Sequence, residues 1–127
     1  MAAYTKNTFV IDASFVLAFL LDESNVEVES FFEKQALGEI HLIAPSLLKY
    51  EIGNCLRTKL LRKQLKKATA QKIYRSFLTI KIEEKTPNFS QVLDFALERK
   101  LTFYDASYLY LAKKNRVNLL SLDHSLK

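Results

Sequence analysis

Carboxylates in apolar surroundings are the residues of this 127-residue chain that are best placed to do chemistry. Asp105 lies in the segment LTFYDASYLYLAKKN (101–115), which we predict to be an apolar, aromatic helix. Tyr108 and Ala112 follow it three and seven positions later, so on a helix the three residues share one face. That face should pack into a core, where a lone carboxylate costs free energy. We therefore expect Asp105 to be buried beside other carboxylates that share its function.

Three other acids stand in similar surroundings. Asp12 directly follows an apolar run, Asp123 ends the segment LLSLD one residue after a predicted strand, and Glu51 flanks an apolar helical stripe. Simpler interpretations exist for each acid: Asp12 and Asp105 as N-caps, Asp123 as a turn residue, and Glu51 as a boundary residue that extends to water. Asp94 is the useful comparison, because it also lies within a predicted helix but shares its face with polar residues.

Strands and helices alternate along the chain. The predicted strands are 8–11, 41–44, 79–84 and 117–122, and the predicted helices run roughly over 13–21, 24–37, 46–62, 69–78, 89–99 and 105–115. The second helix opens on a capping box, Ser24 to Glu27, and closes at Gly38. Strands separated by helices pair in parallel, with helices on both faces of the sheet. The predicted fold class is α/β, a three-layer α/β/α sandwich around a central parallel sheet of four to five strands.

This topology should gather the four acids at one edge of the sheet. Asp12 and Asp123 follow strand ends, Glu51 lies early in the helix after the second strand, and Asp105 opens the helix that leads to the last strand. Four carboxylates brought together raise one another's pKa unless a cation neutralises them. Because the set offers oxygen ligands without a His or Cys cluster, we predict that the ion is Mg²⁺ or Mn²⁺.

Composition limits the classes of protein that this chain can be. It is 49% hydrophobic and long enough for a core, so we expect one domain over residues 1–127. A single cysteine, Cys55, excludes an internal disulfide and a Cys-based zinc cluster, and makes a reducing cytoplasm the expected compartment. Two glycines leave no Gly-rich phosphate loop. The longest apolar run, 15–21, is too short to span a bilayer, and no signal-peptide pattern precedes it, so we expect no membrane association.

The net charge of +5 comes from one segment. Residues 57–75 include eight basic residues and no acid, whereas the rest of the chain has 11 basic against 14 acidic residues. Such local basicity is typical of a surface that binds a polyanion. On charge alone, a solvated pair of lysine-rich helices explains the segment equally well.

The motifs that carry the acids resemble those of the PIN-domain family, and specifically of VapC-type toxin ribonucleases. FVIDAS is similar to the opening strand with the first acid, Asp12, and APSLLKYEIGNCLR to the helix with the glutamate, Glu51. LTFYDASYLYLAKK is similar to the segment with the third acid, Asp105, and is the most specific of these motifs. LLSLDHSLK is similar to the last strand and fourth acid, Asp123, and ends where many relatives continue into another strand or helix.

The resemblance implies a Mg²⁺- or Mn²⁺-dependent endoribonuclease. Asp12, Asp105 and Asp123 would hold one or two ions. Glu51 would bind metal directly or through water, or orient the attacking water. In such a mechanism the ion lowers the pKa of a bound water, and the resulting hydroxide attacks a backbone phosphate in line.

The resemblance also implies supporting contacts and partners. Ser14, Asn54 and Ser121 would hydrogen-bond near the carboxylates and fix their rotamers. With phosphate binding implied, we favour RNA as the partner of the basic segment, and assign RNA contacts to Arg57, Lys59, Arg62, Lys63, Lys66 and Lys67. A VapB-like antitoxin and a second copy in a homodimer are the expected protein partners. The aromatic side chains Phe15, Phe19, Phe31 and Phe32 could serve such contacts, although core packing explains most of them more simply.

Other functions remain open at this point. A PIN-domain nuclease of RNA maturation is hardly distinguished by sequence, and a non-catalytic RNA-binding domain would retain the acids without using them. Phosphoryl-acceptor domains that resemble response regulators need an acidic pair near the first strand, and haloacid-dehalogenase-like phosphatases need Asp-x-Asp where this chain has Ser14. His41 and His124 are too far apart in the pattern to suggest a ligand pair, and Cys55 without a nearby His suggests a packed thiol.

Overall fold

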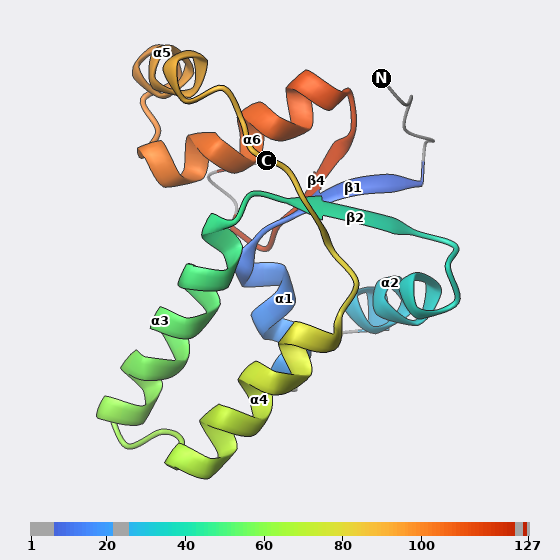
Figure 1. Ribbon diagram of the computed structural model, residues 1–127, viewed down its shortest axis with the longest axis vertical. Coiled ribbons are helices and arrows are strands. Elements are labelled where there is room, and N and C mark those ends of the chain that lie inside the picture. The colour runs from blue at the N-terminus through green and yellow to red at the C-terminus, as the bar shows by residue number, and fades with distance from the viewer. Residues whose placement is uncertain (1–6, 22–25, 124–125, 127) are drawn as a thin grey trace.

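A parallel sheet of four strands, in the order β3-β2-β1-β4, lies at the centre of the molecule (Figure 1). The structure, a computed structural model, describes residues 7–21, 26–123 and 126. Its strands are β1 (Thr8–Ile11), β2 (His41–Ala44), β3 (Glu83–Glu84) and β4 (Asn118–Leu120). Val10 pairs with Ile43 on one side and with Leu119 on the other. The interior position of β1 agrees with its continuous apolar sequence, since both faces of a central parallel strand are covered.

The helices cover the two faces of the sheet in an order that follows from the connections. Over the described residues they are α1 (Ala13–Leu20), α2 (Val26–Ala36), α3 (Leu47–Leu61), α4 (Lys67–Thr79), α5 (Phe89–Arg99) and α6 (Phe103–Asn115). The chain moves from β1 through β2 to β3 in one direction, then returns to the other side of β1 for β4. Because parallel crossovers are right-handed, α1–α4 cover one face and α5 and α6 the other (Figure 1). The predicted three-layer α/β/α sandwich is confirmed.

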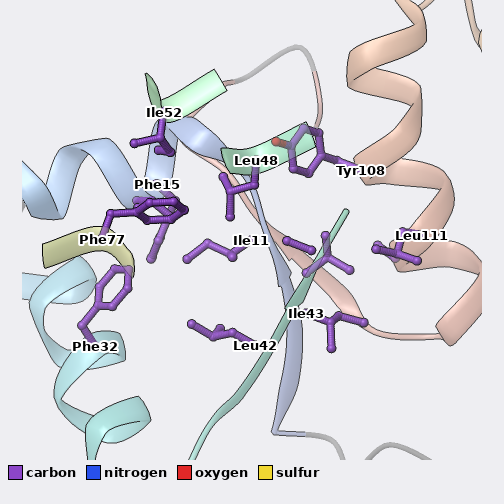
Figure 2. Close-up of a cluster of buried hydrophobic side chains, with 14 of the residues drawn as sticks. Ile11, Phe15, Phe32, Leu42, Ile43, Leu48, Ile52, Phe77, Tyr108 and Leu111 are labelled. Atoms are coloured by element: carbon purple, nitrogen blue, oxygen red, sulfur yellow. The ribbon is translucent and has the colours of Figure 1, made fainter. Parts of the chain in front are cut away.

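The main hydrophobic core lies between the sheet and the helices on both faces (Figure 2). Ile11 and Ile43 of the sheet are fully buried, and Ile52 of α3 packs with them. Burial of each such side chain stabilises the fold by roughly 1.5–3 kcal/mol. The aromatic residues of α1 and α2 pack on one another, with Phe15 against Phe31 and Phe32 and with Phe19 stacked on Phe32 at a centroid distance of 4.2 Å. Phe15 and Phe32 are buried in the core and Phe31 packs against it, as the simpler interpretation predicts, whereas Phe19 remains 37% exposed.

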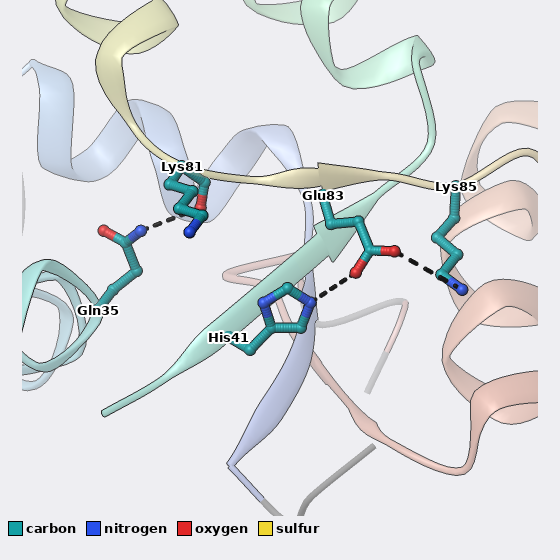
Figure 3. Close-up of polar contacts among 5 residues, drawn as sticks. All are labelled: Gln35, His41, Lys81, Glu83 and Lys85. Atoms are coloured by element: carbon teal, nitrogen blue, oxygen red, sulfur yellow. Dashed lines mark hydrogen bonds and ion pairs between the residues drawn. The ribbon is translucent and has the colours of Figure 1, made fainter. Parts of the chain in front are cut away.

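β3 is shorter than the alternating sequence TIKIEE predicts. The predicted strand over 79–84 is wrong over 79–82, because α4 continues to Thr79 and pairing with β2 begins only at Glu83. Ile80 and Ile82 still pack half-buried against the core. This explains why apolar and polar residues alternate here although the backbone of these residues does not pair with β2. Figure 3 shows a side-chain contact between β2 and β3, in which His41 Nε2 lies 2.7 Å from Glu83 Oε1. The other oxygen of the Glu83 carboxylate contacts Lys85.

One strand end near the acids also differs from the prediction. β4 ends at Leu120, so Asp123 follows the strand by three residues rather than one. The chain leaves α2 through Gly38 at a φ of 79°, as predicted for a glycine that ends a helix. Ser24 of the predicted capping box lies outside the described residues. In the part of the chain that the structure describes, no helix has the length and apolar character that crossing a membrane requires.

Candidate active site

Asp12 lies at the carboxyl end of β1, where the order of the strands reverses. Its backbone N–H donates to Leu120 O at 3.2 Å and thus ties β1 to β4. Its Oδ1 accepts hydrogen bonds from Ser14 Oγ at 2.7 Å and from Phe15 N at 3.2 Å. The side chain is only 5% exposed. Asp12 is therefore the N-cap of α1, and because both bonds fall on Oδ1, Oδ2 is the oxygen with which it can bind an ion.

Ser14 connects the ends of β1 and β4. Its hydroxyl donates to Asp12 and accepts from the Leu122 backbone N–H at 2.9 Å. Ser121 Oγ lies 3.4 Å from Ser14 Oγ and accepts from the Asp123 backbone N–H at 2.9 Å. Both serines thus lie where the sequence predicts them, but Ser14 contacts a carboxylate, whereas Ser121 holds the backbone of Asp123. The carboxylate of Asp123 is exposed at the edge of the sheet.

Glu51 lies in the second turn of α3 and is half-buried. The hydroxyl of Tyr108, from α6, donates to Glu51 Oε1 at 2.5 Å. Burial raises the pKa of Glu51 above its ordinary value, the bond from Tyr108 lowers it, and repulsion by Asp105 and Asp12 raises it further, so that the net shift is upward. Glu51 therefore interacts electrostatically with two of the other predicted acids, Asp105 and Asp12.

Asp105 lies in the first turn of α6, and the N-cap of that helix is Thr102. Thr102 Oγ1 accepts from the Asp105 backbone N–H at 3.0 Å, so the interpretation of Asp105 as an N-cap is wrong. Asp105 is half-buried, whereas the sequence predicted a buried side chain. Burial raises the pKa of Asp105, repulsion by Asp123 raises it, the Thr102 side chain lowers it, and Asp12 raises it, with a net upward shift.

The structure thus brings the four predicted acids into one electrostatically coupled group at the edge of the sheet. Among the residues that the structure describes, no set of three or more His, Cys, Asp or Glu side chains already surrounds one point as metal ligands. An all-oxygen donor set whose members raise one another's pKa fits Mg²⁺ or Mn²⁺ in its ligand chemistry.

The predicted RNA-binding residues lie farther along α3 and α4, on a segment that we call the basic hairpin (residues 57–75). Arg62 is the C-cap of α3, and ideal helix geometry puts it about 16 Å along the axis from Glu51 and nearly in line with it. Arg57 lies on another side, where it and Arg75 line a cavity of about 410 Å³ between α3 and α4. The basic residues therefore do not form one surface. Lys59 is half-buried, and the exposed members of the predicted set are Arg57, Arg62, Lys63, Lys66 and Lys67.

Three further side chains near the acids show what the sequence analysis found or missed. Asn54, predicted to contact a carboxylate, is exposed one turn after Glu51. Thr102 was missed, although its position three residues before Asp105 is the spacing of an N-cap. The ring of Tyr108 was correctly assigned to the core, but its bond to Glu51 was missed. The available signal was that a tyrosine hydroxyl on a core face needs a polar partner.

Known proteins resemble this chain in sequence and in fold. A family model described as PIN domain matches residues 9–127. Ribonuclease VapC3 of Pyrobaculum aerophilum is 31% identical over 121 residues, which cover 92% of this chain and 90% of that protein. Exonuclease VapC9 of the same organism is 35% identical over 93 residues, or 73% and 66% of the two chains. The crystal structure of PAE2754 from Pyrobaculum aerophilum matches with a TM-score of 0.75 at 30% identity, over 94% of this chain and 76% of that one.

Proposed function

Because this chain belongs to the PIN-domain family and to its VapC-type members, we propose that it is a Mg²⁺- or Mn²⁺-dependent endoribonuclease. The observation that carries the proposal is the electrostatic coupling of Asp12, Glu51, Asp105 and Asp123 at the point where the strand order reverses. The relatives support nuclease activity in general terms, since one is named a ribonuclease and another an exonuclease. Metal dependence, RNA as substrate and internal cleavage are the parts that this proposal adds.

Each carboxylate has a role that follows from its surroundings. Asp12, held by Ser14 on one oxygen, would offer its other oxygen to the ion, and Asp105 and Asp123 would supply further ligands. Glu51 would bind the ion or orient the attacking water, with Oε1 held by Tyr108. When bound, the ion supplies a Lewis acid for hydrolysis of a phosphodiester.

RNA would approach this group along α3. Arg62, on the same side of the helix as Glu51, would contact a phosphate and add affinity that falls with salt and carries no sequence information. Tyr104, which directly precedes Asp105, is 60% exposed and could stack on an unpaired base. Single-stranded RNA is therefore the substrate class that we propose.

The proposal also includes two protein partners, a VapB-like antitoxin and a second copy of the chain. The VapC names of the relatives support the antitoxin. A second copy is supported by α5, where Phe89, Leu93 and Leu97 recur every four residues and remain 57%, 50% and 72% exposed. A continuous apolar stripe of this kind on one side of a helix marks an interaction surface. Two copies related by a two-fold axis would cover each other's stripe.

The proposal is tested by incubating the protein with a circular single-stranded RNA. A circle has no ends, so only an endonuclease can open it. We expect opening with Mg²⁺ or Mn²⁺ and none with chelator. Asp12→Asn should reduce the rate by about 100-fold or more, since it removes a charged ligand from the group.

Asp94→Asn is the matched control, because Asp94 is an exposed aspartate of α5 and should be dispensable. Full activity of Asp12→Asn, or an equal loss in Asp94→Asn, would contradict the assignment. RNA binding without cleavage by the wild-type protein would instead support a non-catalytic domain. Cleavage of linear but not circular RNA would replace the endonuclease by an exonuclease.

A further inference from the structure

Tyr108 places a neutral hydroxyl among the carboxylates. Its side chain is 2% exposed, and its ring belongs to the main hydrophobic core, with the hydroxyl end beside α3 (Figure 2). The hydroxyl donates to Glu51 Oε1 at 2.5 Å, within the range of a charge-assisted bond. It also interacts electrostatically with Asp12 and Asp105. One buried hydroxyl therefore bonds to Glu51 and lies within electrostatic range of Asp12 and Asp105.

The packing of the ring fixes where this hydroxyl lies. A tyrosine side chain has two main rotatable bonds, and a ring enclosed by core residues cannot change either without displacing them. Glu51, in contrast, is a half-exposed side chain with three rotatable bonds. The bond between them therefore restricts the flexible carboxylate. Because Oε1 accepts from Tyr108, Oε2 is the oxygen available for other contacts.

We propose that Tyr108 is a positioning residue, which holds Glu51 in the orientation that binds the divalent ion. This inference rests on the proposed function and adds to it a residue that acts through another, without touching the ion or the RNA. The hydroxyl also satisfies one carboxylate oxygen without adding charge. An arginine or lysine at this place would compete with the ion for the acids, whereas tyrosine orients Glu51 and leaves the negative charge of the group intact.

The test is the affinity for Mn²⁺ alone, measured by titration calorimetry or by the electron paramagnetic resonance of free Mn²⁺, without RNA. Tyr108→Phe removes only the hydroxyl and should weaken Mn²⁺ binding about 10-fold or more, the usual effect of losing a contact that orients a ligand. Tyr110→Phe is the matched control. It removes a hydroxyl from the same helix, where that hydroxyl bonds to Gln91 of α5, and should change the affinity less than about twofold.

A double-mutant cycle separates positioning from a general loss of structure. In a Glu51→Ala background, Tyr108→Phe should cost no further Mn²⁺ affinity, because the hydroxyl has no Glu51 to hold. Glu51→Asp repeats the test without altering the core. It keeps the charge but shortens the side chain by one methylene group, so it too should weaken Mn²⁺ binding about 10-fold.

The possible outcomes distinguish this inference from the proposed function. Equal Mn²⁺ affinity of wild type and Tyr108→Phe, or an equal loss in the Glu51→Ala background, would overturn the positioning role. Wild-type affinity in Glu51→Asp would do the same. Failure of the wild-type protein to bind Mn²⁺ and to cleave RNA would instead overturn the proposed function itself.

Discussion

Ser14→Ala removes the hydroxyl that links the carboxyl ends of β1 and β4. In the wild-type protein this hydroxyl donates to Asp12 Oδ1 at 2.7 Å and accepts from the Leu122 N–H at 2.9 Å. The substitution leaves the helix and the core unchanged, because Ser14 is a half-buried residue in the first turn of α1. Its effects should therefore come from these two bonds.

The magnitude follows from the kind of bond that is lost. A hydrogen bond to a charged group contributes roughly 1.5–3 kcal/mol, and a neutral one roughly 0.5–1.5 kcal/mol. The bond to Leu122 N lies at an exposed position, so water replaces much of it. Alanine also favours the helix over serine by roughly 0.5 kcal/mol. We therefore expect the free energy of unfolding to fall by about 2 kcal/mol. Mn²⁺ affinity should fall about 10- to 100-fold, since Asp12 loses the contact that orients it.

Urea unfolding in chelator measures the first effect, and calorimetric titration with Mn²⁺ measures the second. Ser107→Ala is the control for both. Ser107 is buried, and its hydroxyl donates to Phe103 O at 2.9 Å within α6, away from any carboxylate. Loss of that neutral bond is offset by the better helix propensity of alanine, so stability should change by less than about 1 kcal/mol and Mn²⁺ affinity should not change. If Ser14→Ala behaves like Ser107→Ala in both assays, the reasoning from this hydrogen-bond network is wrong.

Three further predictions concern charge and assembly. The pKa values of Glu51 and Asp105 are raised above their ordinary values of 4.5 and 3.8. Just above these pH values the folded state therefore binds more protons than the unfolded state, so the contribution of Glu51 and Asp105 to the free energy of unfolding falls as pH rises. Asp105→Asn should consequently gain stability over wild type in chelator as pH rises from 4 to 7, as urea unfolding would show, and an unchanged difference would contradict the repulsion. Arg62→Gln should reduce the slope of log affinity for single-stranded RNA against log salt by about 0.7, while Lys34→Gln on α2, the control, should leave it unchanged. Leu97→Glu should convert a dimer into a monomer, as light scattering would show, while Leu37→Glu, at another exposed leucine, should leave the dimer intact. A monomeric wild-type protein would refute the α5 contact.

The sequence predicted the parts of the site that depend on local pattern. Asp12 ends an apolar strand and begins a helix, and both features can be recognised within a few residues. The parallel arrangement of the strands follows from the helices between them, and it places Asp12 and Asp123 at one edge of the sheet. Fold class and the gathering of the acids were predictable for this reason.

Features that depend on tertiary contacts were not predictable in the same way. Both Thr102 and Asp105 are suitable N-caps, and local propensity alone does not choose between them. Packing favours the helix that starts after Thr102, because its first residue, Phe103, stacks on Phe89 of α5 with their ring centroids 6.3 Å apart. The bond between Tyr108 and Glu51 joins residues 57 positions apart, so no local pattern contains it.

β3 illustrates a different limit. Alternating burial of Ile80 and Ile82 is real, but alternation records which side chains face the core and not whether the backbone pairs with a neighbour. Side-chain burial and backbone pairing can differ at the edge of a sheet, because an edge strand has only one neighbouring strand. In β3 the pairing with β2 is confined to Glu83 and Glu84.

A crystal of the protein soaked in Mn²⁺ tests the central claim most directly. Anomalous scattering locates Mn²⁺ independently of any assumption about its ligands. We expect a peak between the carboxylates of Asp12 and Asp105, about 2.0–2.3 Å from their oxygens, with Asp123 and the Tyr108-bonded Glu51 beside it. A fully occupied ion elsewhere on the molecule, with none between these four side chains, would contradict this claim.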